Sequence, residues 1–270
     1  MKIPMFASAS LLTLLTLLTP ACAVAPGDEG LAAEEALTTS SALDTGLSST
    51  ELESLTTADA SKAARSLVEG QTKGCKTRTI DPELPNVVRV TLSGCKGRLG
   101  KHVVNGEMII TFTSNPDGSL HAEHVSQNLT IDGRPASRRA SADITLDGEL
   151  RRVVRRGVKT GTSRRGDSFT KTTDEVVVVD RASRCRVING SGIAVFDDGR
   201  RVESILADLR LCEDEAGVDR CPTGTITHVD ASKDKKVTQR FDGSPVAVID
   251  VSSRKGDESR LWQLDCASAP

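Results

Sequence analysis

Short turn signals recur along most of this chain, and they constrain its fold more than any other feature. Asp-Gly pairs stand at 117–118, 132–133, 147–148, 198–199 and 242–243, and the first three are fifteen residues apart. Asp-Gly favours two-residue hairpin turns, because both central positions of such a turn need a positive φ. Turns spaced in this way predict long antiparallel strands that follow one another as a meander.

Apolar and polar residues alternate between these turns, which indicates strands with one buried and one solvated face. One strand would bury Ala136, Ala140, Ala142, Ile144 and Leu146, interrupted by Arg138, and another would bury Ile205, Ala207, Leu209 and Leu211. We therefore expect a mainly β fold, a long-stranded antiparallel meander that forms an open curved sheet or a partly closed barrel, with one N-terminal helix. Only 2% of residues are aromatic, which favours a broad shallow sheet, with Trp262 in its core.

The N-terminus has the order of charged, apolar and small residues that is typical of a secretory signal peptide, predicted over 1–21. Its apolar run is shorter than the roughly 20 residues that span a bilayer. Residues 18–22 are similar to a bacterial lipobox, in which Cys22 would carry the lipid, although Leu18 lies four places before the cysteine rather than three. The alternative is ordinary cleavage after Ala23, which would give a secreted protein.

Composition divides the rest of the chain into three parts. Residues 22–47 are acidic and contain no Lys or Arg, which predicts a disordered tether. The spacing of apolar residues over 48–70 predicts a short helix that begins at Ser48–Thr50 and ends at Gly70. The turn-rich remainder, 71–266, is the predicted β domain.

Seven cysteines in an exported chain become six when Cys22 carries lipid, and six cysteines make three disulfides. A turn centred on Pro85 places Cys75 opposite Cys95, and a turn at 198–199 places Cys185 opposite Cys212. Cys221 is then left for Cys266. The main alternative joins Cys212 to Cys221, and the sequence leaves the connectivity open.

The same turns predict ion pairs across neighbouring strands. A turn at 147–148 sets Arg152 opposite Asp143, and a turn near Gly166 sets Arg156 opposite Glu175. Such pairs support the register more than they stabilise the fold.

Motifs that carry chemistry are missing from the sequence. His121 and His124 lie three apart on a predicted strand and so point to opposite faces, which does not suit a metal site. The acidic run from Glu213 to Asp219 lacks the spacing of a calcium loop and is interpreted as solvated. With no recognisable nucleophile or nucleotide motif, we expect no catalytic residue, no metal and no cofactor, and hence not an enzyme.

Charge is distributed unevenly along the chain. Residues 134–210 hold 17 basic and 11 acidic residues, whereas 23–69 hold 9 acidic and 2 basic ones. The basic sheet could dock a polyanion such as lipopolysaccharide. The preferred interpretation is that the acidic tether lies against the sheet or that neighbouring strands neutralise each other. Few aromatics are available to stack on bases, so no nucleic acid is expected.

Three short motifs resemble those of exported bacterial lipoproteins of uncharacterised role, which have a cysteine-studded β meander. They lie at 93–97 (Ser-Gly-Cys-Lys-Gly), 105–107 (Asn-Gly-Glu) and 221–226 (Cys-Pro-Thr-Gly-Thr-Ile). The resemblance implies a lipid anchor and an acidic tether but no activity.

Together these observations predict an exported, lipid-anchored, non-catalytic protein at the bacterial outer membrane or in the periplasm, with a binding or structural role. The lipid on Cys22 would join it to the membrane, and a polyanion or a lipid is the expected class of ligand. One alternative is a periplasmic carrier for lipid or acyl chains, because a long curved sheet that holds a helix is the architecture of lipoprotein-carrier proteins. Another is a secreted enzyme. The oligomeric state is left open.

Overall fold

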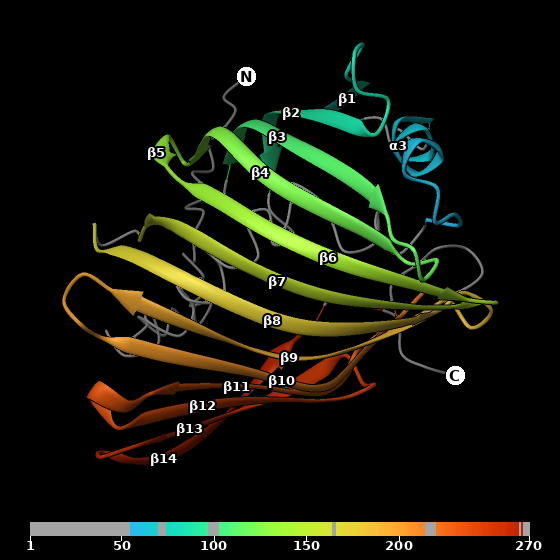
Figure 1. The fold of residues 1–270 in the computed structure, drawn as a ribbon. Helices are drawn as coiled ribbons and strands as arrows, with labels where there is room; N and C mark the ends of the chain where they lie inside the picture. The colour runs from blue at the N-terminus through green and yellow to red at the C-terminus, as the bar shows by residue number, and fades with distance from the viewer. Residues whose placement is uncertain are drawn as a thin grey trace, which may run out of the picture.

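One antiparallel sheet of 14 strands makes up most of the protein (Figure 1). The structure is a computed structural model that describes residues 55–69, 74–96, 103–163, 166–213, 220–264 and 266. Successive strands are neighbours throughout, except that the two-residue β5 (Arg134–Pro135) pairs with β4 beside the main path. β1 and β14 end the sheet and do not pair, so the sheet is open. The predicted meander with one N-terminal helix is confirmed.

The remaining strands have the following bounds: β1 Lys76–Ile80, β2 Val87–Lys96, β3 Val103–Ser114, β4 Leu120–Ile131, β6 Ser137–Asp147, β7 Leu150–Thr162, β8 Ser168–Asp180, β9 Cys185–Phe196, β10 Arg201–Cys212, β11 Thr223–Asp230, β12 Lys235–Asp242, β13 Val246–Ser253 and β14 Gly256–Gln263. A short 3-10 helix, η1 (Ala231–Lys233), joins β11 to β12.

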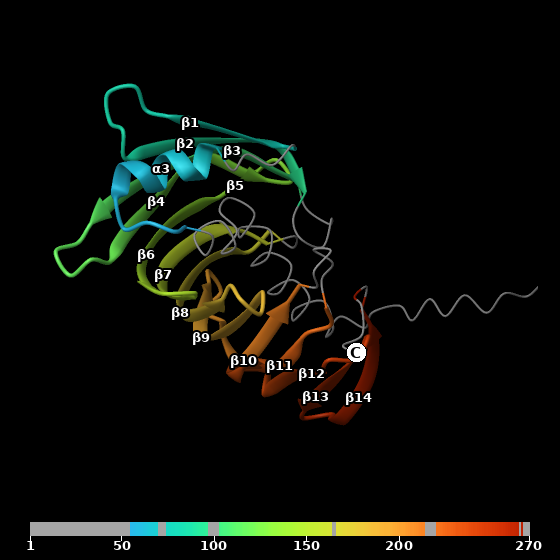
Figure 2. The same cartoon turned by 90° about the vertical axis from the view of Figure 1, so that its right-hand side faces the viewer.

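The sheet is curved, and the helix α3 (Ala60–Glu69) lies on its concave side (Figure 2). Asp59 caps the helix, since its side chain accepts from the Lys62 N–H at 2.8 Å. Ser114 at the end of β3 accepts from the Ala60 N–H at 2.9 Å and so pins the helix start to the sheet. The helix is thus shorter than the one expected over 48–70. The expected cap at Ser48–Thr50 lies outside the described residues.

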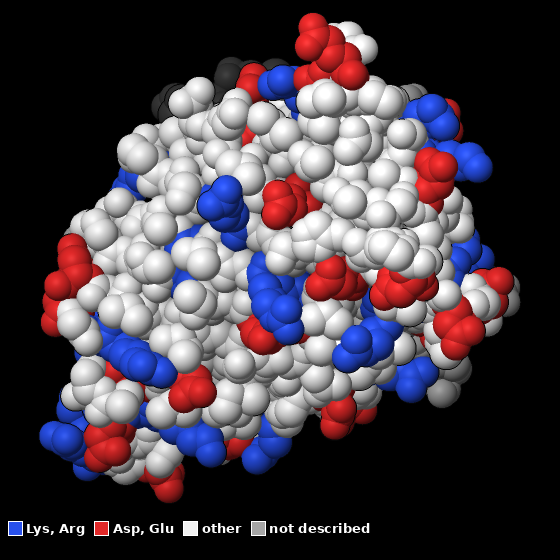
Figure 3. Space-filling view, viewed as in Figure 1, with Lys and Arg blue, Asp and Glu red and all other residues white. Residues whose placement is uncertain are grey.

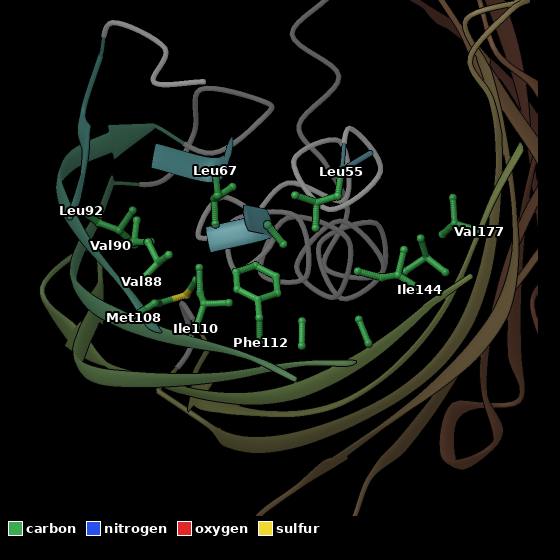
Figure 4. Close-up of a cluster of buried hydrophobic side chains, with 14 of the residues drawn as sticks. Leu55, Leu67, Val88, Val90, Leu92, Met108, Ile110, Phe112, Ile144 and Val177 are labelled. Carbon is green, nitrogen blue, oxygen red and sulfur yellow. The ribbon is translucent and has the colours of Figure 1, made fainter. Parts of the chain in front are cut away.

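The apolar core fills the space between α3 and the first strands. Helix residues Ala63, Ala64 and Leu67 are buried against side chains from β2 and β3. Figure 4 shows Val88, Val90, Leu92, Met108, Ile110 and Phe112 pointing toward the helix from the concave face. Within the described chain, no helix is long and apolar enough to cross a membrane.

Trp262 does not belong to this core, contrary to expectation. It lies on β14, an edge strand whose residues are all exposed, and its side chain remains 40% exposed. An edge strand has a neighbour on one side only, so even a large apolar side chain there keeps contact with water.

Three disulfides are present, and they are the pairs that the turns favoured. They join Cys75 to Cys95, Cys185 to Cys212 and Cys221 to Cys266. Such bonds persist in oxidising compartments, so they are compatible with an exported protein.

In the β9–β10 hairpin, Cys185 and Cys212 are paired as predicted, but the turn and the register between them differ from the prediction. The turn holds three residues, because the Phe196 N–H donates to the Arg200 carbonyl at 2.9 Å. That loop shifts the register by one, and a bulge between Leu206 and Leu209 shifts it back before Cys212 meets Cys185.

The bulge also corrects the predicted buried face of β10. Before the bulge, even-numbered residues face the concave side, and Val202 and Ser204 are buried there. After the bulge, odd-numbered residues face that side, and Leu209 is buried. The expectation that Ile205 and Ala207 are buried is therefore wrong, and Ile205 is 41% exposed. Asp208 takes the positive φ that such a kink requires.

Both predicted cross-strand pairs are wrong in register, by two residues in the β6–β7 hairpin and by one in the β7–β8 hairpin. β6 turns into β7 one residue later than expected, so Arg152 faces Thr145 and Asp143 faces Val154. 

In the next hairpin, Arg155 rather than Arg156 faces Glu175, with 2.8 Å between Nη2 and Oε2. Arg156 faces Asp174 instead. A one-residue slip moves a side chain to the other face, so these corrections decide which charges lie inside.

A substitution at Gly190 of β9 can test how closely β8 and β9 approach each other on the concave side. A Cβ at this position would lie 2.6 Å from the Asp174 carbonyl oxygen and 2.8 Å from the Glu175 Cα. We expect Gly190→Ala to lower the free energy of unfolding by about 1–3 kcal/mol, because backbone must move to admit the methyl group. Ser191→Ala, on the exposed face, should change it by less than about 0.5 kcal/mol. Equal losses in urea unfolding would contradict this account.

Candidate functional site

Three cations lie side by side on the concave face of β6, β7 and β8. Arg138 pairs directly with Lys159, and Lys159 pairs directly with Lys171. All three side chains are nearly enclosed, with 8%, 4% and 8% of their surface exposed. We call this set the cationic row. Like charges placed directly opposite each other destabilise a sheet, so the arrangement needs anions nearby.

A second row on the same face is apolar and crosses the sheet from β4 to β10. Direct strand partners form it: Leu120, Ile144, Val153, Val177, Ile188 and Leu209. All six are buried and belong to the core cluster. Figure 4 shows Ile144 and Val177 extending this lining away from α3. We call this set the apolar row. It is a contiguous series of apolar side chains across the concave face.

The apolar row and the cationic row cross the same strands at different positions along their length. On β7, Val153 of the apolar row and Lys159 of the cationic row are six positions apart, which is roughly 20 Å of extended chain. The concave face is therefore amphipathic along the strand direction.

Small residues line the floor between the two rows. Gly157 on β7 lies beside Ala140 on β6, and Gly192 occupies the equivalent row on β9. A Cβ on Gly192 would meet the Lys171 Cε at 3.2 Å, so the lysine stem lies flat across this glycine.

His124 stands at the edge of this floor and has no hydrogen-bond partner. Its side chain is 3% exposed, and both ring nitrogens are buried without a partner. Burial lowers the pKa of His124 to about 3, helped by the positive charges of Arg138 and Arg155. The ring is therefore neutral near pH 7 and keeps one N–H free to donate to a ligand.

A second buried histidine lies further along the same face. His228 on β11 shares a hydrogen bond with Ser204 on β10, with 2.9 Å between Nδ1 and Oγ. Burial lowers its pKa to about 4, with a further contribution from Lys171. Its Nε2 has no partner, so this pair adds a polar group to the floor.

Arg155 and Glu175 form an ion pair on this face, with 2.8 Å between Nη2 and Oε2. Both side chains are about one fifth exposed, so the pair is partly shielded from water. Glu175 neutralises Arg155. It lies four positions along β8 from Lys171.

The convex face differs from the concave face in how its charged side chains are distributed. Lys, Arg, Asp and Glu are mixed across it, between uncharged areas (Figure 3). His121 faces outward here and contacts Asp143 at 2.6 Å, so the two histidines diverge as their spacing predicted. Exposed pairs such as Arg156 with Asp174 at 3.5 Å contribute little to stability.

Other residues singled out in the sequence do not gather into a site. Among the described residues, no group of three His, Cys, Asp or Glu side chains could hold a metal ion. Cys22 and residues 214–219 of the acidic run lie outside the described chain. The six remaining cysteines are disulfide-bonded.

Sequence reasoning noticed Arg138 as an interruption of an apolar face, but it did not connect this residue with Lys159 and Lys171. The signal that could have found the row is a basic residue at an inward position on three consecutive strands. Finding it requires the register of both hairpins, which the turn positions predicted wrongly by two residues for β6–β7 and by one residue for β7–β8.

Comparison with known proteins adds no identification. No family model matches the chain, and no curated protein or solved structure matches it.

The buried histidines make stability depend on pH. In the folded protein their pKa values are about 3 and about 4, against 6.5 as the ordinary value. The unfolded chain therefore binds more protons below about pH 6.5, and stability is lost as the pH falls through this window.

As the pH falls, the protein loses free energy of unfolding. We expect His124→Leu to reduce this loss by up to about 1.4 kcal/mol per pH unit, because one protonation site of the unfolded chain disappears. Urea unfolding at about pH 7 and about pH 5 measures the difference. An unchanged pH slope would show that His124 is not held neutral in the fold.

Proposed function

We propose that this protein is a lipid-anchored, non-catalytic binding protein of the bacterial cell envelope, and that its concave face binds an anion with an acyl chain. The observation that carries the proposal is the placement of the apolar row and the cationic row on one face. An acyl chain would lie along the apolar row, and its anionic head would reach the cationic row.

The location rests on the sequence and on the disulfides. The signal peptide and Cys22 support export and lipid attachment, and the three disulfides are compatible with an oxidising compartment. An anchored protein that binds acyl anions would act beside the membrane that contains such molecules.

Binding can be tested with the chain 23–270, which keeps every described residue. We expect a fluorescent long-chain fatty acid to bind, and the double variant Lys159→Gln/Lys171→Gln to weaken its binding about tenfold, equivalent to about 1.4 kcal/mol. The fluorescent alcohol of the same chain length lacks the charge and should bind both proteins equally.

A matched control neutralises Arg139 and Arg152, which are exposed on the other face of β6 and β7. Arg139→Gln/Arg152→Gln should leave both affinities unchanged. If the fatty acid binds no better than the alcohol, the cationic row does not recognise the head group. If neither probe binds, the proposed function is wrong.

The anchor is tested by mass spectrometry of the protein extracted from bacterial membranes. We expect a mature chain that starts at Cys22, carries acyl chains and gains six hydrogens on reduction of its three disulfides. A product that starts at Val24 and lacks acyl chains would contradict lipid attachment.

A further inference from the structure

β14 is the last strand of the sheet, and among the described residues no strand pairs with its outer side (Figure 1). Every residue of β14 is exposed, including two large apolar side chains: Leu261 is 76% exposed and Trp262 is 40% exposed. A strand at the edge of a sheet presents N–H and C=O groups that another strand can bind. The outer side of β14 is therefore a surface on which a further strand fits.

The pairing with β13 determines which backbone groups of β14 face outward. The Leu264 N–H donates to the Pro245 carbonyl at 2.8 Å, in the same register as the β13–β14 pairs. Hydrogen bonds to one neighbouring strand involve every second residue of an antiparallel strand. The even-numbered residues of β14 thus bond to β13. Asp257, Ser259 and Leu261 direct their N–H and C=O groups to the open edge.

A second copy of β14 fits this edge in one antiparallel register. When Ser259 of one copy faces Ser259 of the other, the outward groups of the three odd-numbered residues meet and form about six hydrogen bonds. The same register places Glu258 of each copy opposite Arg260 of the other. The two adjacent registers instead place Glu258 opposite Glu258 or Arg260 opposite Arg260, and like charges directly opposite each other destabilise a sheet. Charge therefore selects the register centred on Ser259.

Glu258 and Arg260 are two residues apart, so they lie on one face of the strand. Within one copy, Arg260 Nε lies 2.6 Å from Glu258 Oε1, and both side chains are about half exposed. Pairing would bring a second carboxylate and a second guanidinium to the same face, which makes a group of four alternating charges. Charged side chains on an edge strand usually prevent pairing with other strands. In β14 their pattern disfavours most partners and matches a second copy.

Trp262 lies on the same face as these charges, and the register places it opposite Gly256 of the second copy. A Cβ on Gly256 would have no atom within 4 Å, so the space beside this glycine is open. An aromatic side chain that covers an edge glycine on the neighbouring strand stabilises the pair. Pairing would thus bury part of an indole ring that a single copy leaves in contact with water.

We propose that two copies of this protein associate through β14, across a two-fold axis at Ser259, so that their two sheets become one continuous antiparallel sheet. Side chains of directly opposed residues point to the same face of a sheet, so both concave faces open on the same side. The partner is a second copy of the chain because the edge is complementary to itself in hydrogen bonding and in charge. A single pair of strands is a small interface, so the association is weak and depends on concentration. It does not depend on the proposed function.

Association is tested by sedimentation velocity of the chain 23–270 at concentrations up to about 1 mM, a range that suits a small interface. We expect a monomer at low concentration and a dimer at high concentration. Trp262 is the one tryptophan of the sequence, so its emission should shift to the blue over the same concentration range. A monomer at every concentration, a dimer without the emission shift, or oligomers that grow beyond the dimer would overturn the proposal.

Charge reversal tests the register. Glu258→Arg and Arg260→Glu each place like charges opposite each other, so we expect each variant alone to dimerise at least about tenfold more weakly. An equimolar mixture of the two variants has opposite charges at both positions and should form a mixed dimer about as tightly as the unmodified chain. A mixture that associates no better than either variant alone would show that the register is wrong.

The backbone is tested at the two-fold axis. Ser259→Pro removes an outward N–H that does not bond to β13, and proline is tolerated at such edge positions. We expect the variant to keep its midpoint of unfolding in urea and to remain a monomer. The matched variant Ser259→Ala keeps the N–H and should dimerise like the unmodified chain. Dimerisation of both variants with equal affinity would contradict pairing through β14, and if the proline variant unfolds early, the mixture of charge variants decides.

Discussion

Repulsion among three buried cations is the constraint around which the concave face is arranged. Arg138, Lys159 and Lys171 are held in direct register by two continuous hairpins, so none of them can move away without breaking strand pairing. The positive charge of Arg138 also acts on His124, which stays neutral and has no hydrogen-bond partner. A face with these properties is suited to bind a negative group.

The meander makes such a face possible because every strand pairs with its neighbours in the sequence. The core is thick at the end where α3 packs on β1 to β3, and it thins toward β14, whose residues are all exposed. Disulfides reinforce the regions that the core supports least. Cys221–Cys266 closes the last strands, and Cys185–Cys212 joins β9 to β10. The distal sheet thereby stays ordered without filling its concave side with large apolar residues, which leaves room for the small-residue floor.

The sequence was sufficient for the architecture and insufficient for the register. Asp-Gly pairs located the hairpins because a positive φ is a local requirement, and Gly118, Gly133, Gly148, Gly199 and Gly243 all adopt it. The number of residues in each turn, by contrast, could not be read from the Asp-Gly pair alone. The loop at 196–200 holds three residues, and the bulge before Leu209 compensates for it, so the Cys185–Cys212 pair was obtained although the predicted turn was wrong.

The candidate site depended on register and was therefore missed. A one-residue error assigns Arg156 instead of Arg155 to Glu175, and it hides the alignment of Lys159 with Lys171. Helix extent failed for a different reason. Asp59 caps α3, and the hydrogen bond from the Ala60 N–H to the Ser114 hydroxyl of β3 holds the helix start at this position, which only tertiary structure reveals.

The arrangement of the two rows also argues for the class of ligand. A long polyanion would follow the cations across the strands and would not use the apolar row. An acyl chain without a charge would contact the apolar row and would not use the cationic row. A molecule that carries both groups satisfies both rows, and its length is set by the roughly 20 Å between them.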